Sequence, residues 1–159
     1  MNPVSAPSQA IRVKVMATIP QDFFLHQLPG GRTEWGRCRF SFDPNDRDYD
    51  WLVVYDDLPP KHGEPRAQRQ EQLACPRANT LLTTSEPSTI KHFGDAFTAQ
   101  FGHVLTSQAA WALPHPRRIY SHAGLHWFYG LGSRGNMPFD EMVAHPPLQK
   151  TADLSMVFS

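Results

Sequence analysis

The sequence predicts an α/β domain of the Rossmann-like type, with three layers and a mostly parallel sheet in the middle. Short apolar runs of strand character recur along the chain, separated by segments of helical or irregular character. Two of these runs, Trp51–Tyr55 (WLVVY) and residues 80–84 (TLLTT), consist of apolar or β-branched residues, which is typical of central strands covered on both faces. Strands that alternate with helices favour parallel pairing, so we expect a parallel sheet.

The N-terminal part of the chain predicts two further strands and a short helix. Residues 11–18 (IRVKVMAT) alternate apolar with basic side chains, which indicates the first strand. Residues 22–28 favour a short helix that the following Pro-Gly-Gly ends. Residues 35–42 (WGRCRFSF) alternate again and predict a second strand, with Cys38, Phe40 and Phe42 on one face.

The strand over residues 80–84 leads into a predicted turn and helix. Glu86 precedes Pro87, and a proline favours extended backbone in the residue before it. Ser88 is a suitable N-cap for a helix over residues 89–100. The apolar residues of this segment recur at helical spacing: Ile90, Phe93, Phe97 and Phe101.

Shorter patterns predict the remaining elements. We expect a surface helix over residues 65–73, a strand over 103–107 and a long ordered loop over 108–135. Residues 139–144 favour a helical turn, and residues 154–158 (LSMVF) have the pattern of another strand.

Composition excludes several classes of protein. The 159 residues contain 15 basic and 15 acidic side chains, so net charge gives no reason to expect a nucleic-acid partner. Cys38 and Cys75 cannot form a disulfide framework and lack zinc-ligand spacing. No apolar run reaches membrane-spanning length and no signal peptide is evident, so we expect a cytoplasmic protein, or one peripheral to the inner membrane face.

Three carboxylates follow predicted strands and are the chemical candidates of the chain. Ligands of open α/β sheets bind outside the carboxyl ends of the strands, where Glu86, Asp56 and Asp57 are expected. Glu86 is a candidate general base, with the alternative that it caps the following helix. Asp56 and Asp57 are candidates for binding substrate hydroxyls, with the alternative that they shape a solvated turn.

Aromatic and histidine residues concentrate in the predicted loop over residues 108–135. Trp127 and Tyr129 are candidates for stacking on sugar rings, as is Trp111, with packing under the loop as the alternative. Three histidines lie close together in this loop without a carboxylate or thiolate at ligand spacing, so we expect no metal site. No glycine fingerprint for a dinucleotide or a P-loop is present, which disfavours an independent nucleotide-binding domain.

Several strings of residues resemble the N-terminal half of family-10 glycosyltransferases, the fucosyltransferase-like group, and most closely its bacterial members. They are DYDWLVVYDDLP, TLLTTSEPSTIKHFG, FGHVLTSQ and WALPHPRRIYSHAGLHWFYG, which begin at residues 48, 80, 101 and 111. The final ten residues, KTADLSMVFS, resemble the linker and first strand that open the second domain of that family.

The resemblance implies one half of an inverting transferase with two facing Rossmann-like domains. The second domain would hold most of the nucleotide-sugar donor, usually GDP-fucose, and the first domain would bind the glycan acceptor. Glu86, in a Ser85-Glu86-Pro87 turn, matches the family's catalytic base, although here proline follows the glutamate directly. Ser85 would then contact the acceptor. No other cofactor is implied.

The predicted organisation has three parts. Residues 1–10 form a flexible tail, residues 11–149 the acceptor-side domain, and residues 150–159 the linker and first strand of a missing donor domain. We expect the chain alone to have little transferase activity. A non-catalytic carbohydrate-binding or interaction domain derived from this fold is the alternative, since it would need the aromatic loop but not Glu86.

Overall fold

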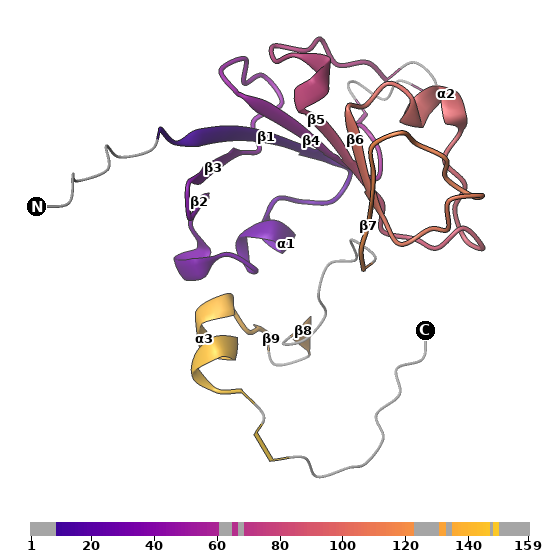
Figure 1. Cartoon of the computed structure of the whole chain (residues 1–159). Helices are drawn as coiled ribbons and strands as arrows, with labels where there is room; N and C mark the ends of the chain where they lie inside the picture. Colours follow the sequence, from indigo (N-terminus) through magenta and orange to yellow (C-terminus); the bar gives the residue numbers. More distant parts are fainter. Residues whose placement is uncertain are drawn as a thin grey trace, which may run out of the picture.

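A seven-stranded sheet forms the body of the protein in a computed structural model (Figure 1). The structure describes residues 9–60, 65–66, 69–122, 131–132, 135–146 and 148–149. The strands lie in the order β2-β3-β1-β4-β5-β6-β7, and every neighbouring pair is parallel except β2 with β3. The prediction of a mostly parallel sheet in an α/β domain is therefore confirmed.

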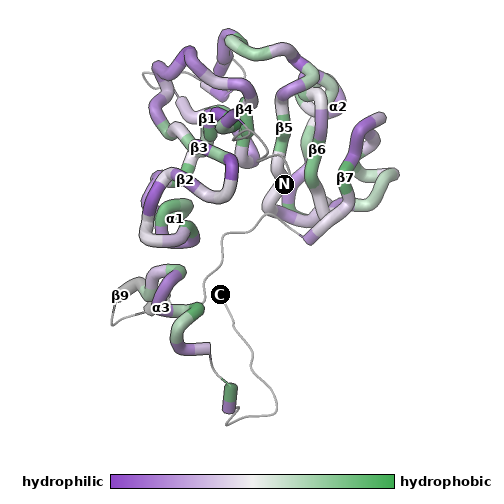
Figure 2. Tube along the Cα trace, turned by 60° about the vertical axis from the view of Figure 1, so that its left-hand side comes forward, coloured by the Kyte–Doolittle hydropathy of each residue, from purple (hydrophilic) through white to green (hydrophobic). Residues whose placement is uncertain are grey.

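The predicted strands agree closely with the observed ones. The strands of the sheet are β1 (Ile11–Ala17), β2 (Glu34–Trp35), β3 (Cys38–Ser41), β4 (Trp51–Tyr55), β5 (Thr80–Thr83), β6 (His103–Thr106) and β7 (Arg118–Tyr120). The wholly apolar β4 lies in the middle of the sheet, as its composition predicts. Figure 2 shows that β4, β5 and β6 carry hydrophobic stretches.

Helices lie on both faces of the sheet. Because side chains alternate along a strand, Leu52 and Val54 face one side and Val53 and Tyr55 the other. Phe24 of α1 (Asp22–Leu25) contacts the Tyr55 ring edge-on, with the ring centroids 5.5 Å apart. The opposite face is covered by the segment that contains α2 (Asp95–Thr98).

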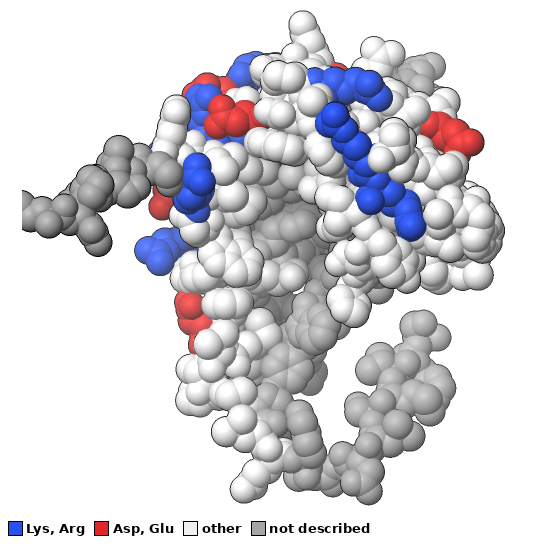
Figure 3. All heavy atoms as spheres, in the orientation of Figure 1, with Lys and Arg blue, Asp and Glu red and all other residues white. Residues whose placement is uncertain are grey.

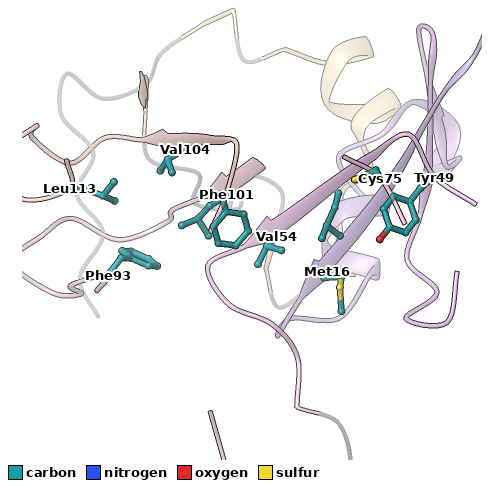
Figure 4. Packing of buried hydrophobic residues seen from close by; sticks show 10 residues of the cluster. Met16, Tyr49, Val54, Cys75, Phe93, Phe101, Val104 and Leu113 are labelled. Atoms are coloured by element: carbon teal, nitrogen blue, oxygen red, sulfur yellow. The ribbon is translucent and has the colours of Figure 1, made fainter. Parts of the chain in front are cut away.

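The main hydrophobic core fills the space between the sheet and the α2 segment. Figure 4 shows side chains from several strands and loops converging there. Its buried members are Met16, Tyr49, Leu52, Val54, Cys75, Leu82, Phe93, Phe101, Val104 and Leu113. Burying side chains of this size contributes about 1.5–3 kcal/mol each, which makes this cluster the main source of stability for the sheet.

A charged residue, Lys14, is fully buried beside this core. Its ammonium donates to the carbonyl oxygens of Pro44 at 2.7 Å and Asp46 at 3.1 Å, and to Oε1 of Glu71 at 3.0 Å. A buried ammonium needs such partners because the desolvation of its charge is costly. The ion pair between Lys14 and Glu71 also holds the segment that contains Glu71 against β1.

Two predicted helices are wrong. The described part of residues 65–73 contains no α-helix, since Arg66 has 3₁₀ geometry, residues 69–73 are not helical and the Glu71 side chain is buried. The helix predicted for residues 89–100 reduces to the single turn of α2, which Gly94 caps. Residues 88–90 form a separate turn in which Ile90 is 72% exposed, so the helical spacing of the apolar residues is not that of one helix face.

Two further boundaries differ from the prediction. The expected strand over residues 35–42 divides into β2 and β3, because Gly36 has φ +59°, a conformation that favours glycine and turns the chain. The expected loop over residues 108–135 contains β7, and also β8 (Leu131–Gly132), which pairs with β9 (Gly135–Asn136). The 3₁₀ turns η1 (Pro29–Gly31) and η3 (Arg77–Asn79) complete the connections.

The predicted helical turn near the C-terminus is α3 (Phe139–Ala144), which lies beside α1 and η1. The backbone N–H of Phe139 donates to the carbonyl of His26 at 2.9 Å, and that of Gly30 donates to the Asp140 carboxylate at 2.6 Å. The strand predicted over residues 154–158, the linker that precedes it and most of the N-terminal tail lie outside the described residues.

Candidate functional site

The carboxyl ends of β4, β5 and β6 meet at one edge of the sheet, because these strands are parallel neighbours. Asp56 follows β4, Ser85 and Glu86 follow β5, and Gln108 follows β6. The structure therefore brings together three of the residues that the sequence predicts, Asp56, Ser85 and Glu86. This edge is the candidate site.

Asp56 ties the ends of two strands together. Its carboxylate accepts a hydrogen bond from the Ser85 backbone N–H at 2.8 Å and another from the Ser85 hydroxyl. Its own N–H donates to the Thr83 carbonyl at 2.8 Å. Asp56 adopts φ +62°, which aspartate tolerates better than most residues because its short side chain can bond locally. Lys91 Nζ lies 3.6 Å from the same carboxylate.

Glu86 is the half-buried residue at the centre of this edge. Within the described part of the chain, its carboxylate makes no hydrogen bond or ion pair with another side chain. The prediction that a helix begins immediately after Glu86 is wrong, so neither a capping role nor a helix N-terminus accounts for this carboxylate. It remains a carboxylate available to a ligand.

Gln108 holds the turn that carries Glu86, and the sequence analysis missed it. Its side-chain amide donates to the Glu86 carbonyl at 2.9 Å and to the Lys91 carbonyl at 3.0 Å, so it closes both ends of the turn. Only 2% of Gln108 is exposed. Its position directly after a predicted strand could have indicated a site residue. The partners of Gln108, however, depend on a turn whose path was not predicted from the sequence.

Asp57 lies beside Asp56 but its surroundings differ. Its side chain is 12% exposed and forms an ion pair with Arg66 Nε, and Arg69 Nη1 lies 3.8 Å away. One carboxylate oxygen also accepts the Leu58 N–H at 2.9 Å. Asp57 therefore shapes the turn after β4, as the alternative role predicts, but its carboxylate is surrounded by protein groups rather than by solvent.

Exposed aromatic side chains flank the candidate site. Trp127 and Tyr129, predicted to stack on sugar rings, lie outside the described residues. Trp111 follows β6 and is 80% exposed, and Tyr120 ends β7 and is 69% exposed. Tyr120 is at the carboxyl edge of the sheet, because β7 runs parallel to β6, whereas Trp111 lies within the connection between these two strands. Tyr120 was missed because β7 is a three-residue strand within a segment predicted as a loop.

Basic side chains line part of the same side of the molecule. Figure 3 shows a band of Lys and Arg atoms over the region where Figure 1 places β6 and β7. Arg118 donates to the Gln108 carbonyl at 2.6 Å, and its guanidinium lies 5.4 Å from the centre of the Tyr120 ring. Arg118 therefore supports both the turn residue Gln108 and an exposed aromatic ring.

The described residues contain no group of three or more His, Cys, Asp or Glu side chains that could hold a metal ion. His115 instead contacts the Phe101 carbonyl at 3.2 Å and accepts the Arg117 N–H at 3.1 Å. Burial raises the pKa of the Cys75 thiol, which makes it a core residue rather than a nucleophile. None of the helices in the described ranges is long and apolar enough to cross a membrane.

The fold and the site define a small α/β domain with a polar carboxyl edge, where the Glu86 carboxylate has no side-chain partner among the described residues. Comparison of the chain with models of protein families, with curated proteins and with solved structures finds no match. The resemblance to family-10 glycosyltransferases therefore stays a prediction, and the residues of the site carry the functional argument.

Proposed function

We propose that this chain is the acceptor-binding domain of an inverting glycosyltransferase that resembles the fucosyltransferases of family 10. One observation carries the proposal: at the carboxyl edge of the sheet, on a turn held by Asp56 and Gln108, the Glu86 carboxylate has no side-chain partner in the part of the chain that the structure describes. Ligands of open α/β sheets bind at this edge. A general base needs both access to substrate and a fixed position, and the contacts around Glu86 favour both.

In the proposed reaction, Glu86 accepts the proton of an acceptor hydroxyl as that oxygen attacks the anomeric carbon of the donor sugar. The bond from that carbon to the nucleoside diphosphate breaks in the same displacement, which inverts the configuration. Because the nucleotide departs as an anion already, no proton has to be supplied to it by this domain. The donor, a nucleotide sugar of the GDP-fucose type, would be held mainly by a second domain.

The acceptor would be a glycan that lies along the edge between Glu86 and the exposed rings. Aromatic faces stack on the apolar C–H surface of a sugar ring, and Tyr120 is exposed at the carboxyl end of β7, with Trp111 exposed in the connection before it. Asp56 would position Glu86 through Ser85, because its carboxylate already accepts two hydrogen bonds from Ser85. Asp57 is held by Arg66 and would contribute to the acceptor site only beside that ion pair.

A second candidate function is a carbohydrate-binding domain without catalysis. The exposure of Trp111 and Tyr120 favours it, because these rings would serve sugar binding whether or not Glu86 acts as a base. The two functions differ in what Glu86 is needed for.

The deciding experiment compares Glu86→Gln with the control Glu141→Gln, which changes an exposed glutamate of α3. The complete reading frame that contains these residues is assayed for sugar transfer from GDP-fucose to an array of immobilised glycans, and the 159-residue chain is assayed for binding to the same array. We expect Glu86→Gln to retain glycan binding and to lose turnover by a factor of about 10² or more. Unchanged turnover in Glu86→Gln would exclude Glu86 as the base.

Glycan binding with no turnover in any variant would favour the non-catalytic alternative. Absence of both binding and turnover in the unmodified protein would overturn both functions. The 159-residue chain alone should transfer little or no sugar, because the proposal places most of the donor site elsewhere.

A further inference from the structure

A cleft of about 870 Å³ opens on the face of the sheet that α2 covers. Leu52 and Val54 of β4 form its floor. Phe93 and Phe97 form an aromatic wall, and Arg66 and Arg69 form a cationic wall. Its volume falls in the range of about 300–1,000 Å³ that is usual for small-molecule sites.

The cationic wall of the cleft is incompletely paired. Arg66 Nε forms an ion pair with Asp57, and Arg69 Nη1 donates to the Leu58 carbonyl at 2.9 Å. Arg69 has a side chain that is only 18% exposed, yet its buried Nε has no hydrogen-bond acceptor among the described residues. A guanidinium buried to this extent normally has its N–H groups satisfied.

Among the described residues, positive charge exceeds negative charge in the ion pairs along this wall. Two carboxylates of the lining, Asp57 and Glu71, form ion pairs with four cations among the described residues. The four cations are Lys14, Arg47, Arg66 and Arg69. A bound anion would balance this excess and would supply an acceptor to the arginines.

We propose that this cleft binds a small organic anion, with an aromatic or apolar body against Phe93 and Phe97 and a phosphate or carboxylate group against Arg66 and Arg69. The apolar floor and aromatic wall would take the body, and the arginines would fix its orientation, which is the usual division of roles in ligand pockets. Glu86 does not line this cleft, although Asp57 and His92 of the lining lie next to the candidate site, and binding of an anion here does not depend on the proposed glycosyl transfer.

The test uses four fragments that separate the two halves of the ligand. Phenyl phosphate and benzoate carry both an aromatic body and an anion, inorganic phosphate carries only the anion, and benzyl alcohol only the body. Each is titrated into the full chain by NMR. We expect phenyl phosphate or benzoate to bind at least tenfold more tightly than either half, and the preferred anion identifies a phosphorylated or a carboxylated ligand.

Two variants locate the binding. Arg69→Gln removes the cation, and Ala96→Phe fills the cleft from an exposed position of α2 without changing an arginine. Each should weaken binding of the tighter fragment at least tenfold, while Arg37→Gln, an exposed arginine of the β2–β3 turn, should not. Urea unfolding confirms that each variant is folded. The proposal is overturned if neither aromatic anion binds saturably, or if binding is unchanged in the folded Ala96→Phe variant.

Discussion

The Asp56 carboxylate accepts hydrogen bonds from both the backbone N–H and the hydroxyl of Ser85, so these two residues join the carboxyl ends of β4 and β5. Asp56 has φ +62° and a side chain that is 14% exposed. The residue therefore combines an uncommon backbone conformation with a nearly buried charge. The hydrogen bonds from Ser85 to this carboxylate hold Ser85, and with it the neighbouring Glu86, at the edge of the sheet.

Replacing Asp56 separates these two contributions. Asp56→Ala removes the acceptor and places alanine in the left-handed region, and should lower the free energy of unfolding by about 2–4 kcal/mol. Asp56→Asn tolerates this φ and keeps an acceptor for the Ser85 N–H, so its loss should be smaller. Urea unfolding at pH 7 measures both. Equal losses in the two variants would show that neither the acceptor for the Ser85 N–H nor the left-handed backbone of residue 56 contributes to stability.

Gln108→Ala should loosen the Glu86 turn without unfolding the sheet. Gln108 donates to the carbonyls at both ends of this turn, and inside it the N–H groups of Ile90 and Lys91 donate to the Pro87 carbonyl at 3.0 Å. Loss of the amide should speed hydrogen exchange at these two N–H groups about tenfold, which corresponds to ~1.4 kcal/mol.

The matched control for this experiment is Gln100→Ala, because the exposed Gln100 amide bonds only within the α2 region. Its exchange at Ile90 and Lys91 should equal that of the unmodified protein. If Gln108→Ala leaves the exchange of both N–H groups unchanged, another contact holds the turn.

Much of the sheet could be predicted from the sequence because short strands carry strong local signals. The wholly apolar Trp51–Tyr55 is a buried central strand, β4. The residues that follow β4 and β5 lie together at the carboxyl edge of the sheet, because these strands are parallel neighbours. Asp56, Ser85 and Glu86 were therefore placed together correctly. Gln108 and Lys91 join them only through the path of a turn, which no local pattern encodes.

The helix predicted after Glu86 shows why helical spacing was insufficient. Phe93 and Phe101 are 5% and 7% exposed and belong to the core, as their spacing predicts, but Ile90 is 72% exposed. These two buried residues lie outside the single helical turn of α2, since Phe93 precedes it and Phe101 is in a bend after it. Tertiary packing, rather than one helical face, selects these positions, so the same spacing arises without a long helix.

Lys14→Met should be strongly destabilising, although Lys14 looks like a surface residue in the alternating pattern of β1. Its side chain has no exposed surface, and it shares Glu71 with Arg47, whose side chain is 51% exposed. Removing the buried partner should cost about 3–5 kcal/mol, because Glu71 stays buried with less compensation. Arg47→Met removes the exposed partner of the same carboxylate and should cost less than about 1 kcal/mol. Urea unfolding that ranks the two variants equally would contradict this difference.

Gly102→Ala tests a close approach between backbone segments. A Cβ atom at Gly102 would lie 2.5 Å from the carbonyl oxygen of Arg77 and 2.7 Å from that of Ala78, and backbone cannot move aside as a flexible side chain does. We expect a loss of about 2–3 kcal/mol in the free energy of unfolding. Gly94→Ala is the control, since no atom outside its chain neighbours lies within 4 Å of its Cβ position, and should cost about 1 kcal/mol or less, because alanine is a poorer N-cap than glycine. A Gly102→Ala variant as stable as the control would show that η3 does not lie against Gly102.

The ion pair between Arg12 and Asp50 predicts how stability depends on pH under acid conditions. Hydrogen bonds from the Arg12 side chain and backbone lower the pKa of Asp50 from 3.8 to about 2. A carboxylate whose pKa is lower in the folded state binds its proton more readily when unfolded. Its contribution is therefore complete above pH 4 and is lost as the pH falls from about 4 to about 2.

Asp50→Asn should remove this part of the acid sensitivity. The variant should be less stable than the unmodified protein at pH 7, and its stability should fall less steeply between pH 4 and pH 2. The urea midpoint measured across this range gives the comparison, with Asp22→Asn as a control at an exposed aspartate. The same steepness in Asp50→Asn and in the unmodified protein would show that other carboxylates carry the acid dependence. If the stability of Asp50→Asn depends less steeply on pH than that of both the control and the unmodified protein, the acid dependence belongs to the ion pair between Arg12, at the start of β1, and Asp50, directly before β4.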